Sequence, residues 1–125
     1  MRYICLIHFD EQALATMPAD QRNALNAAHL DFNDELRRTG NFLMAEALDP
    51  PRTGSTVRVR NGRTVVTDGP FAETKEMIAG FYVIEAADLK EATEIAARIP
   101  AAPLATIEVR PACQLVVAGR EPRWG

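Results

Sequence analysis

The segment Asp68-Gly69-Pro70-Phe71 most constrains how this chain can fold, because it separates two valines from the apolar run at residues 78–84. Glycine adopts positive φ without a Cβ clash, and proline has no N–H for a ladder and disfavours a helical conformation at the residue before it. A strand should therefore end at Asp68, with its carboxylate beside a stiff turn. Phe71 is a large ring for a turn, so we expect it to be anchored against the core or a partner chain.

Hydrophobic periodicity and turn signals predict the order strand, helix, strand, hairpin, strand, helix, strand. The expected strands are residues 2–9, 41–48, 56–60, 64–68, 78–86 and 105–110, and the expected helices are residues 18–39 and 88–99. Asn61-Gly62 is the hairpin turn, Gly40 ends the first helix, and Asp88 caps the second. Residues 10–16 are expected to form a loop or an irregular turn, residues 115–117 a short edge strand, and residues 119–125 a tail.

Without the hairpin this order is βαββαβ. It predicts one α+β domain over residues 1–125 with a ferredoxin-like antiparallel sheet, an inserted β-hairpin and two helices on one face. Residues expected to face the core from the first helix and the hairpin are Leu25, Ala28, Phe32, Leu36, Val57 and Val59. The first strand carries apolar residues on both faces, and the predicted helices cover only one. An uncovered apolar sheet face predicts a homodimer.

Composition excludes several classes of function. Lys and Arg number 14 against 17 Asp and Glu, which gives a net charge of −3, and the basic residues form no stripe that would bind nucleic acid. No apolar run is long enough to cross a membrane, and the N-terminal apolar stretch is too short for a signal peptide, so we expect the cytoplasm. Cys5 and Cys113 lack the spacing of metal ligands and are expected to be small buried hydrophobes. No phosphate-binding glycine motif or histidine pair indicates a cofactor or a metal.

His29 is the strongest candidate for chemistry. It lies one turn after Leu25 and projects to the inward side of the helix, so its imidazole needs a hydrogen-bond partner. Asp68 is the candidate partner, and a buried His–Asp pair would make a general base near neutral pH. The structural alternative is that His29 is a satisfied core histidine and Asp68 only caps its turn. His8, on a strand face that we expect to be buried, is interpreted as structural.

The sequence DGPFAETKEMIAGFYVIE, together with EAADLKEATEIAARIP, ATIEVRPA and the opening MRYICLIHF, resembles the DGPF branch of the YCII-related proteins. The resemblance implies a dimeric α/β-barrel type of fold. It also implies a histidine of the first helix that pairs with an aspartate in the active site. The histidine corresponds to His29, whereas the aspartate could be Asp68, Asp31 or Asp34.

The leading interpretation is a cofactor-independent acid–base enzyme, of lyase or isomerase type, that acts on a small organic molecule. His29 would be the base, Asp68 would orient it, and the substrate-binding residues would be Gly69, Pro70, Phe71 and Lys75. Phe71 would exclude water and Lys75 would bind an anionic group, although a solvated loop is the simpler reading for Lys75. The alternative is a non-catalytic ligand-binding or regulatory module. The resemblance implies an extracytoplasmic-function sigma factor as its partner.

Overall fold

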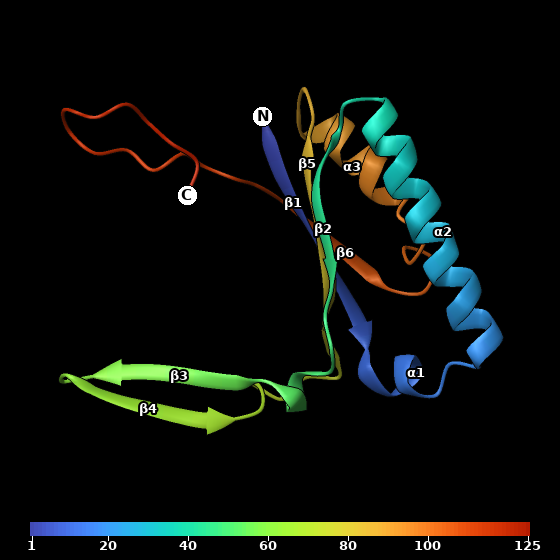
Figure 1. Ribbon diagram of the computed structural model, residues 1–125, viewed down its shortest axis with the longest axis horizontal. Helices are drawn as coiled ribbons and strands as arrows, with labels where there is room; N and C mark the ends of the chain where they lie inside the picture. Colours follow the sequence, from blue (N-terminus) through green and yellow to red (C-terminus); the bar gives the residue numbers. More distant parts are fainter.

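The computed structural model describes residues 1–125 and has a helix layer on one face of an antiparallel sheet (Figure 1). The strands are β1 (Arg2–Asp10), β2 (Phe42–Ala47), β3 (Ser55–Arg60), β4 (Arg63–Asp68), β5 (Glu76–Glu85) and β6 (Thr106–Pro111). The helices are α1 (Glu11–Ala15), α2 (Ala19–Arg38) and α3 (Leu89–Ala97), with a turn of 3-10 helix at Pro51–Thr53. The strand order in the main sheet is β2-β5-β1-β6, and β3 and β4 pair only with each other.

This architecture confirms the predicted α+β fold with its inserted hairpin. All pairs in the main sheet are antiparallel, and β1 and β5 lie at its centre. The two long helices, α2 and α3, lie on the same face (Figure 1). None of the helices is both long and apolar enough to cross a membrane.

One helix was not predicted. Asp10 accepts a hydrogen bond from the backbone N–H of Ala13 and caps α1, in a segment that we expected to be irregular. The prediction was wrong because the segment has little apolar periodicity, and the N-cap residue is its only sequence signal for a helix. The cap of α3 is as predicted, since the N–H of Glu91 donates to the Asp88 carboxylate over 2.8 Å.

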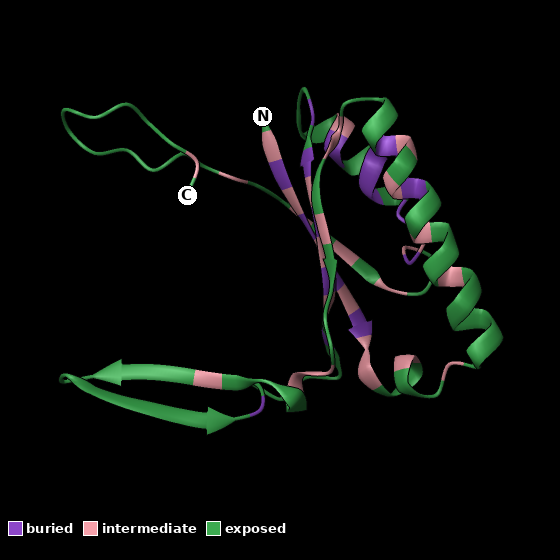
Figure 2. Ribbon diagram, in the orientation of Figure 1, coloured by how far each residue is buried: buried purple, intermediate pink, exposed green.

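The core lies between the helices and one face of the sheet, as the burial colours of Figure 2 show. The buried side of β1 consists of Tyr3, Cys5, Ile7 and Phe9, which pack with residues of β5, α2 and α3. Phe32 and Leu36 face this core from α2, whereas Ala28 is exposed, contrary to prediction. Since alternate residues of a strand point to opposite faces, Ile4 and Leu6 lie on the side of β1 without helices.

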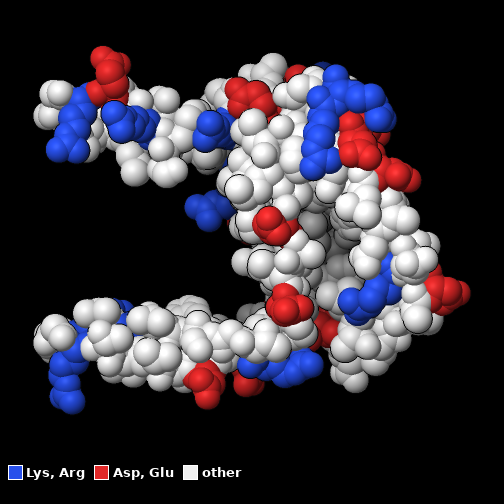
Figure 3. All heavy atoms as spheres, viewed as in Figure 1, with Lys and Arg blue, Asp and Glu red and all other residues white.

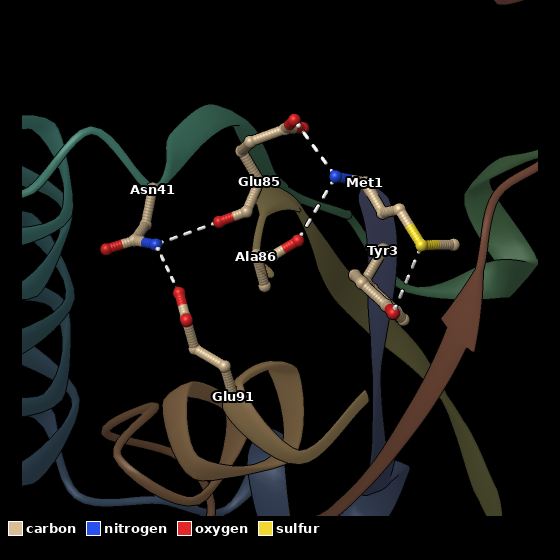
Figure 4. A network of polar contacts seen from close by, with 6 residues as sticks. All are labelled: Met1, Tyr3, Asn41, Glu85, Ala86 and Glu91. Carbon is tan, nitrogen blue, oxygen red and sulfur yellow. Dashed lines mark hydrogen bonds and ion pairs between the residues drawn. The ribbon is translucent and has the colours of Figure 1, made fainter. Parts of the chain in front are cut away.

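Polar contacts lock the edge where α2 ends and α3 begins (Figure 4). The side-chain amide of Asn41 donates to the backbone carbonyl of Glu85 and to the carboxylate of Glu91, over 2.8 and 3.1 Å. The N-terminal ammonium donates to the Glu85 carboxylate and to the Ala86 carbonyl, each over 3.1 Å. These bonds fix α2 relative to the end of β5, and therefore also fix any side chain that α2 presents to the sheet.

Two arms extend from the sheet on the side away from the helices: the β3–β4 hairpin and residues 113–125 (Figure 1). Val57 and Val59 do not face a core, because the hairpin projects into solvent and both are exposed. Residues 115–117 add no strand to the sheet, since Leu115 instead bridges to Arg123 within the second arm. Cys113 is exposed, contrary to the prediction that it is buried, whereas Cys5 is buried as predicted.

Candidate functional site

A cavity of about 430 Å³ lies between α2 and the sheet. A hollow between these two layers is visible in Figure 3. Most of its wall is apolar, with Phe9, Leu14, Leu25, Leu48 and Ala101 among the lining residues. The volume and the mostly apolar wall are typical of sites for small molecules.

Small residues in the sheet make room for this cavity. Ala45 and Ala47 of β2 pair with Tyr82 and Gly80 of β5, and both alanines, Ala79 and Gly80 line the cavity. A Cβ at Gly80 would lie 2.8 Å from the carbonyl oxygen of Glu46, so no other residue fits there without moving the strands. These small side chains leave space between the sheet and α2, and the cavity occupies it.

His29 and Tyr82 meet at the wall of this cavity. The Nδ1 of His29 lies 2.8 Å from the hydroxyl oxygen of Tyr82, and the two rings stack with centroids 6.1 Å apart. Phe32 packs edge-on against the Tyr82 ring, with ring centroids 5.9 Å apart. Because Nδ1 is engaged, Nε2 is the nitrogen of His29 that remains without a hydrogen bond inside the chain.

Burial sets the protonation of both groups. It lowers the pKa of the His29 imidazole, so the neutral form persists to lower pH than in an exposed histidine. Burial, and to a smaller extent the charge of the nearby Cys5 thiolate, raises the pKa of Tyr82 to about 12, so its hydroxyl is protonated near neutral pH. Burial also raises the pKa of Cys5 to about 11, which keeps this thiol protonated and unreactive. The cavity thus holds a neutral imidazole that can accept or donate one proton.

The structure does not bring Asp68 to His29 within the chain. Asp68 ends β4, opposite Ser55 in the hairpin, and is exposed. The hairpin lies on the other side of the sheet from α2 (Figure 1). Asp31 and Asp34 are exposed on α2, and Asp34 pairs with Arg37 over 2.8 Å. No carboxylate occupies the position that Tyr82 takes beside the imidazole.

The other predicted site residues lie at the base of the hairpin and not in the cavity. Gly69 has a positive φ of 87°, as its turn requires, and its N–H donates to the Gly54 carbonyl over 2.8 Å. Pro70 follows it and is exposed. Phe71 is 77% exposed and is therefore not anchored against the core of the chain; the guanidinium carbon of Arg58 lies 5.3 Å from the centroid of its ring. Lys75 is exposed, and its Nζ lies 3.9 Å from a carboxylate oxygen of Asp10.

Sequence reasoning missed Tyr82 and Arg22. Tyr82 lies on a strand whose two faces are both apolar, so alternation alone did not indicate which face meets the helices. Arg22 also lines the cavity, from the first turns of α2, where an arginine is an ordinary surface residue. One signal for Arg22 was available, since residues seven apart share a helix face and Arg22 precedes His29 by seven. His8, which we expected on a buried strand face, lies on the face of the sheet without helices, and its Nε2 is 2.9 Å from a carboxylate oxygen of Glu108.

Fold and cavity together define a small α+β protein with a cavity between a helix and its sheet. Residues 1–115 match the YCII-related domain, and the chain belongs to this family. An uncharacterised protein of Rhizobium meliloti is 36% identical over 104 residues, which are 82% of this chain and 74% of that protein.

Among solved structures, the chain is similar to 5-chloro-2-hydroxyhydroquinone dehydrochlorinase of Burkholderia phenoliruptrix in complex with 2,5-dihydroxybenzoquinone. The TM-score is 0.51 at 18% identity, over 89% of this chain and 92% of that one. At this identity the likeness shows the fold.

Proposed function

We propose that the chain is a cofactor-independent acid–base enzyme that acts on a small organic molecule in the cavity, with His29 as the base. The observation that carries the proposal is the half-buried imidazole at the cavity wall, held by Tyr82 at 2.8 Å and kept neutral by burial. In this scheme Nδ1–H donates to the Tyr82 oxygen, and Nε2 takes a proton from the substrate. It then returns the proton to the substrate in an isomerisation or to a leaving group in an elimination.

The similarity to a dehydrochlorinase supports an elimination, because loss of HCl needs a base and no cofactor. Chloride release from 5-chloro-2-hydroxyhydroquinone is therefore the first assay, followed by other small hydroxylated rings. We expect His29→Ala to lose at least about 100-fold in kcat/KM, the lower range for a general base. Asp31→Ala, an exposed change on the same helix, should keep the activity. Full activity of His29→Ala with any substrate that is turned over would refute the role of His29.

We also propose that the chain is a homodimer that covers the open face of the sheet. Ile4, Leu6 and their neighbours on this face have no helix above them, and both arms extend past it (Figure 1). The arms expose apolar residues, such as Val66 at 61% and Val116 at 75%, and a two-stranded hairpin alone is marginally stable in water. The hairpin carries three arginines and one aspartate, whereas the chain as a whole is acidic, so the charges favour a second copy as the partner.

Sedimentation velocity tests the homodimer. The wild type should sediment as a dimer, and Leu6→Glu should sediment as a monomer because it places a charge on the open face. Ala97→Glu, an exposed change on the outer side of α3, should leave the dimer intact. A monomeric wild type at about 100 μM would exclude a specific homodimer, since stable interfaces of ordinary size bind more tightly than that.

Asp68 and the Gly69-Pro70-Phe71 turn belong to the proposal only through this dimer, because within one chain they lie away from His29. We propose that they approach the cavity of a second copy, with Asp68 near its imidazole, and that the chain belongs to the DGPF branch. An Asp68→Asn variant tests this contact: it should change the pH dependence of activity without changing the dimer. An unchanged pH profile would remove Asp68 from the site.

A non-catalytic interaction module is the second candidate, favoured by the exposed loop from Phe71 to Lys75 at the base of the hairpin. An extracytoplasmic-function sigma factor is the proposed partner. Its capture by the wild type, and loss of capture on charge reversal of Glu73 and Glu76, would support this reading. A sigma factor that binds both proteins equally would refute the loop as its contact.

A further inference from the structure

Arg22 is a cation without a counter-ion at the cavity. It lies on α2, seven residues before His29, and therefore on the same helix face about 10 Å along the axis. One Nη atom donates to the backbone carbonyl of Leu14, which orients the guanidinium. Arg22 takes part in none of the ion pairs of the chain, so its remaining N–H groups are free to bind a ligand.

No other charged side chain approaches the cavity from within the helix–sheet layer. Glu46 is the remaining charged lining residue, and it lies on β2 between Ala45 and Ala47. Both alanines pair with residues of the helix-facing side, so alternation sends the Glu46 side chain towards the open face with its pair residue Phe81. Glu46 thus contributes mainly its backbone to the wall. The field inside the cavity is set by one guanidinium, a neutral imidazole and the amides of Asn26 and Asn33.

We infer that the cavity selects small anionic molecules with an apolar part, and that Arg22 is the residue that determines this specificity. A carboxylate would bind the guanidinium through two parallel N–H donors, and an enolate or phenolate would bind it through its single anionic oxygen. The rest of the ligand would fill the apolar part of the cavity and present its acidic hydrogen to His29. This inference rests on the proposed function, since it names the class of substrate for the same site.

Binding of benzoate and benzamide tests the inference, because the two have the same shape and differ in charge. Binding is measured by calorimetry and by the Cε1–H resonance of His29 in NMR spectra, with the resonance of His8 as an internal reference on the other sheet face. We expect benzoate to shift His29 and to bind at least about tenfold more tightly than benzamide, the effect of a charge-assisted hydrogen bond.

Arg22→Gln should weaken benzoate about tenfold and leave benzamide unchanged, and Arg22→Lys should recover part of the loss because it restores a charge without the planar fork. Arg38→Gln is the matched control, since Arg38 is also exposed and unpaired but lies at the other end of α2. Thermal melts establish that each variant folds. If Arg22→Gln has a lowered melting temperature, the inference is tested instead by the ratio of benzoate to benzamide affinity in Arg22→Lys and in the wild type.

The outcomes separate the two proposals. If benzoate and benzamide both shift His29 with equal affinity, or Arg22→Gln binds benzoate as well as the wild type does, the cavity is a site but its anion specificity is refuted. If neither probe shifts His29 in the wild type, Arg22 does not recruit anions and the inference fails. The proposed base then stands or falls on the turnover assay of His29→Ala alone.

Discussion

Replacing Tyr82 with phenylalanine removes one hydroxyl and isolates what that group does for His29. The ring of Tyr82 is 3% exposed and packs against Phe32 and His29, and phenylalanine retains these contacts. The change therefore deletes one hydrogen bond of 2.8 Å and little else. A bond of this kind contributes about 1 kcal/mol to stability, and the half-buried imidazole can recover part of it from water. We expect a loss of about 0.5 to 1 kcal/mol.

Tyr3→Phe is the matched control. Tyr3 is equally buried at 3%, and its hydroxyl contacts only the sulfur of Met1, at 3.9 Å. This weak contact should contribute less than about 0.5 kcal/mol. Urea denaturation of both variants at pH 8 measures the difference, which corresponds to a shift in midpoint of roughly 0.3 to 0.5 M for Tyr82→Phe.

The tautomer of His29 provides the sharper readout. If His29 is the base, the wild type carries its proton on Nδ1 and donates to the Tyr82 oxygen, which leaves Nε2 free. Nitrogen chemical shifts from long-range NMR correlations distinguish the two tautomers. Tyr82→Phe should lose the preference for Nδ1–H, and Tyr3→Phe should keep it. A wild type with its proton on Nε2 would refute the role of Nε2 as base, whatever the stability of the variants.

Three further results are expected. Burial lowers the pKa of His29 in the fold, so below pH 6.5 or thereabouts the unfolded chain binds a proton that the folded chain does not. The free energy of unfolding should therefore decrease as the pH falls from there towards the lowered pKa of His29. His29→Gln should remove the contribution of this group, as urea titrations at several pH values will show. An equal dependence of the free energy of unfolding on pH in both proteins would contradict this expectation. Gly80→Ala places a Cβ 2.8 Å from the Glu46 carbonyl oxygen and should destabilise the fold by about 1 to 3 kcal/mol. Ala79→Gly, at the neighbouring position, is the control and should cost no more than about 1 kcal/mol. The midpoints of urea denaturation measure both effects. Cys113, which is exposed within the chain, should react with a thiol reagent faster than Cys5, which should react only on unfolding. Two thiols that react equally fast in the native protein would show that the core opens.

Much of the fold could be predicted because its signals are local. The Asn61-Gly62 turn, the Asp88 cap and the Asp68-Gly69 break each act within a few residues, and the structure has a hairpin, a helix and a strand end there. The long helices could be read from apolar spacing. The direction in which the hairpin points could not, because its valines alternate as they would in a strand with a core beneath them.

The candidate site was predicted in part for a similar reason. His29 follows from helix periodicity alone, and it does line a cavity. Its hydrogen-bond partner depends on how α2 lies over β5, and 53 residues separate His29 from Tyr82. A carboxylate was the natural chemical guess for an inward imidazole, but its hydrogen-bond partner is a phenol on β5, one of the two central strands. A neutral partner stabilises an imidazolium less than a carboxylate does, so this base is expected to be weaker than the predicted pair.

The open face and the two arms change what a measurement of stability means. Under the homodimer proposal, burial of these surfaces occurs only on association, and the free energy released by association enters the unfolding equilibrium through mass action. The melting temperature should then rise with protein concentration, by an amount that Leu6→Glu abolishes. The hairpin and the residues beyond Cys113 would be ordered by a neighbour rather than by their own chain, and dilution alone would expose them to proteases.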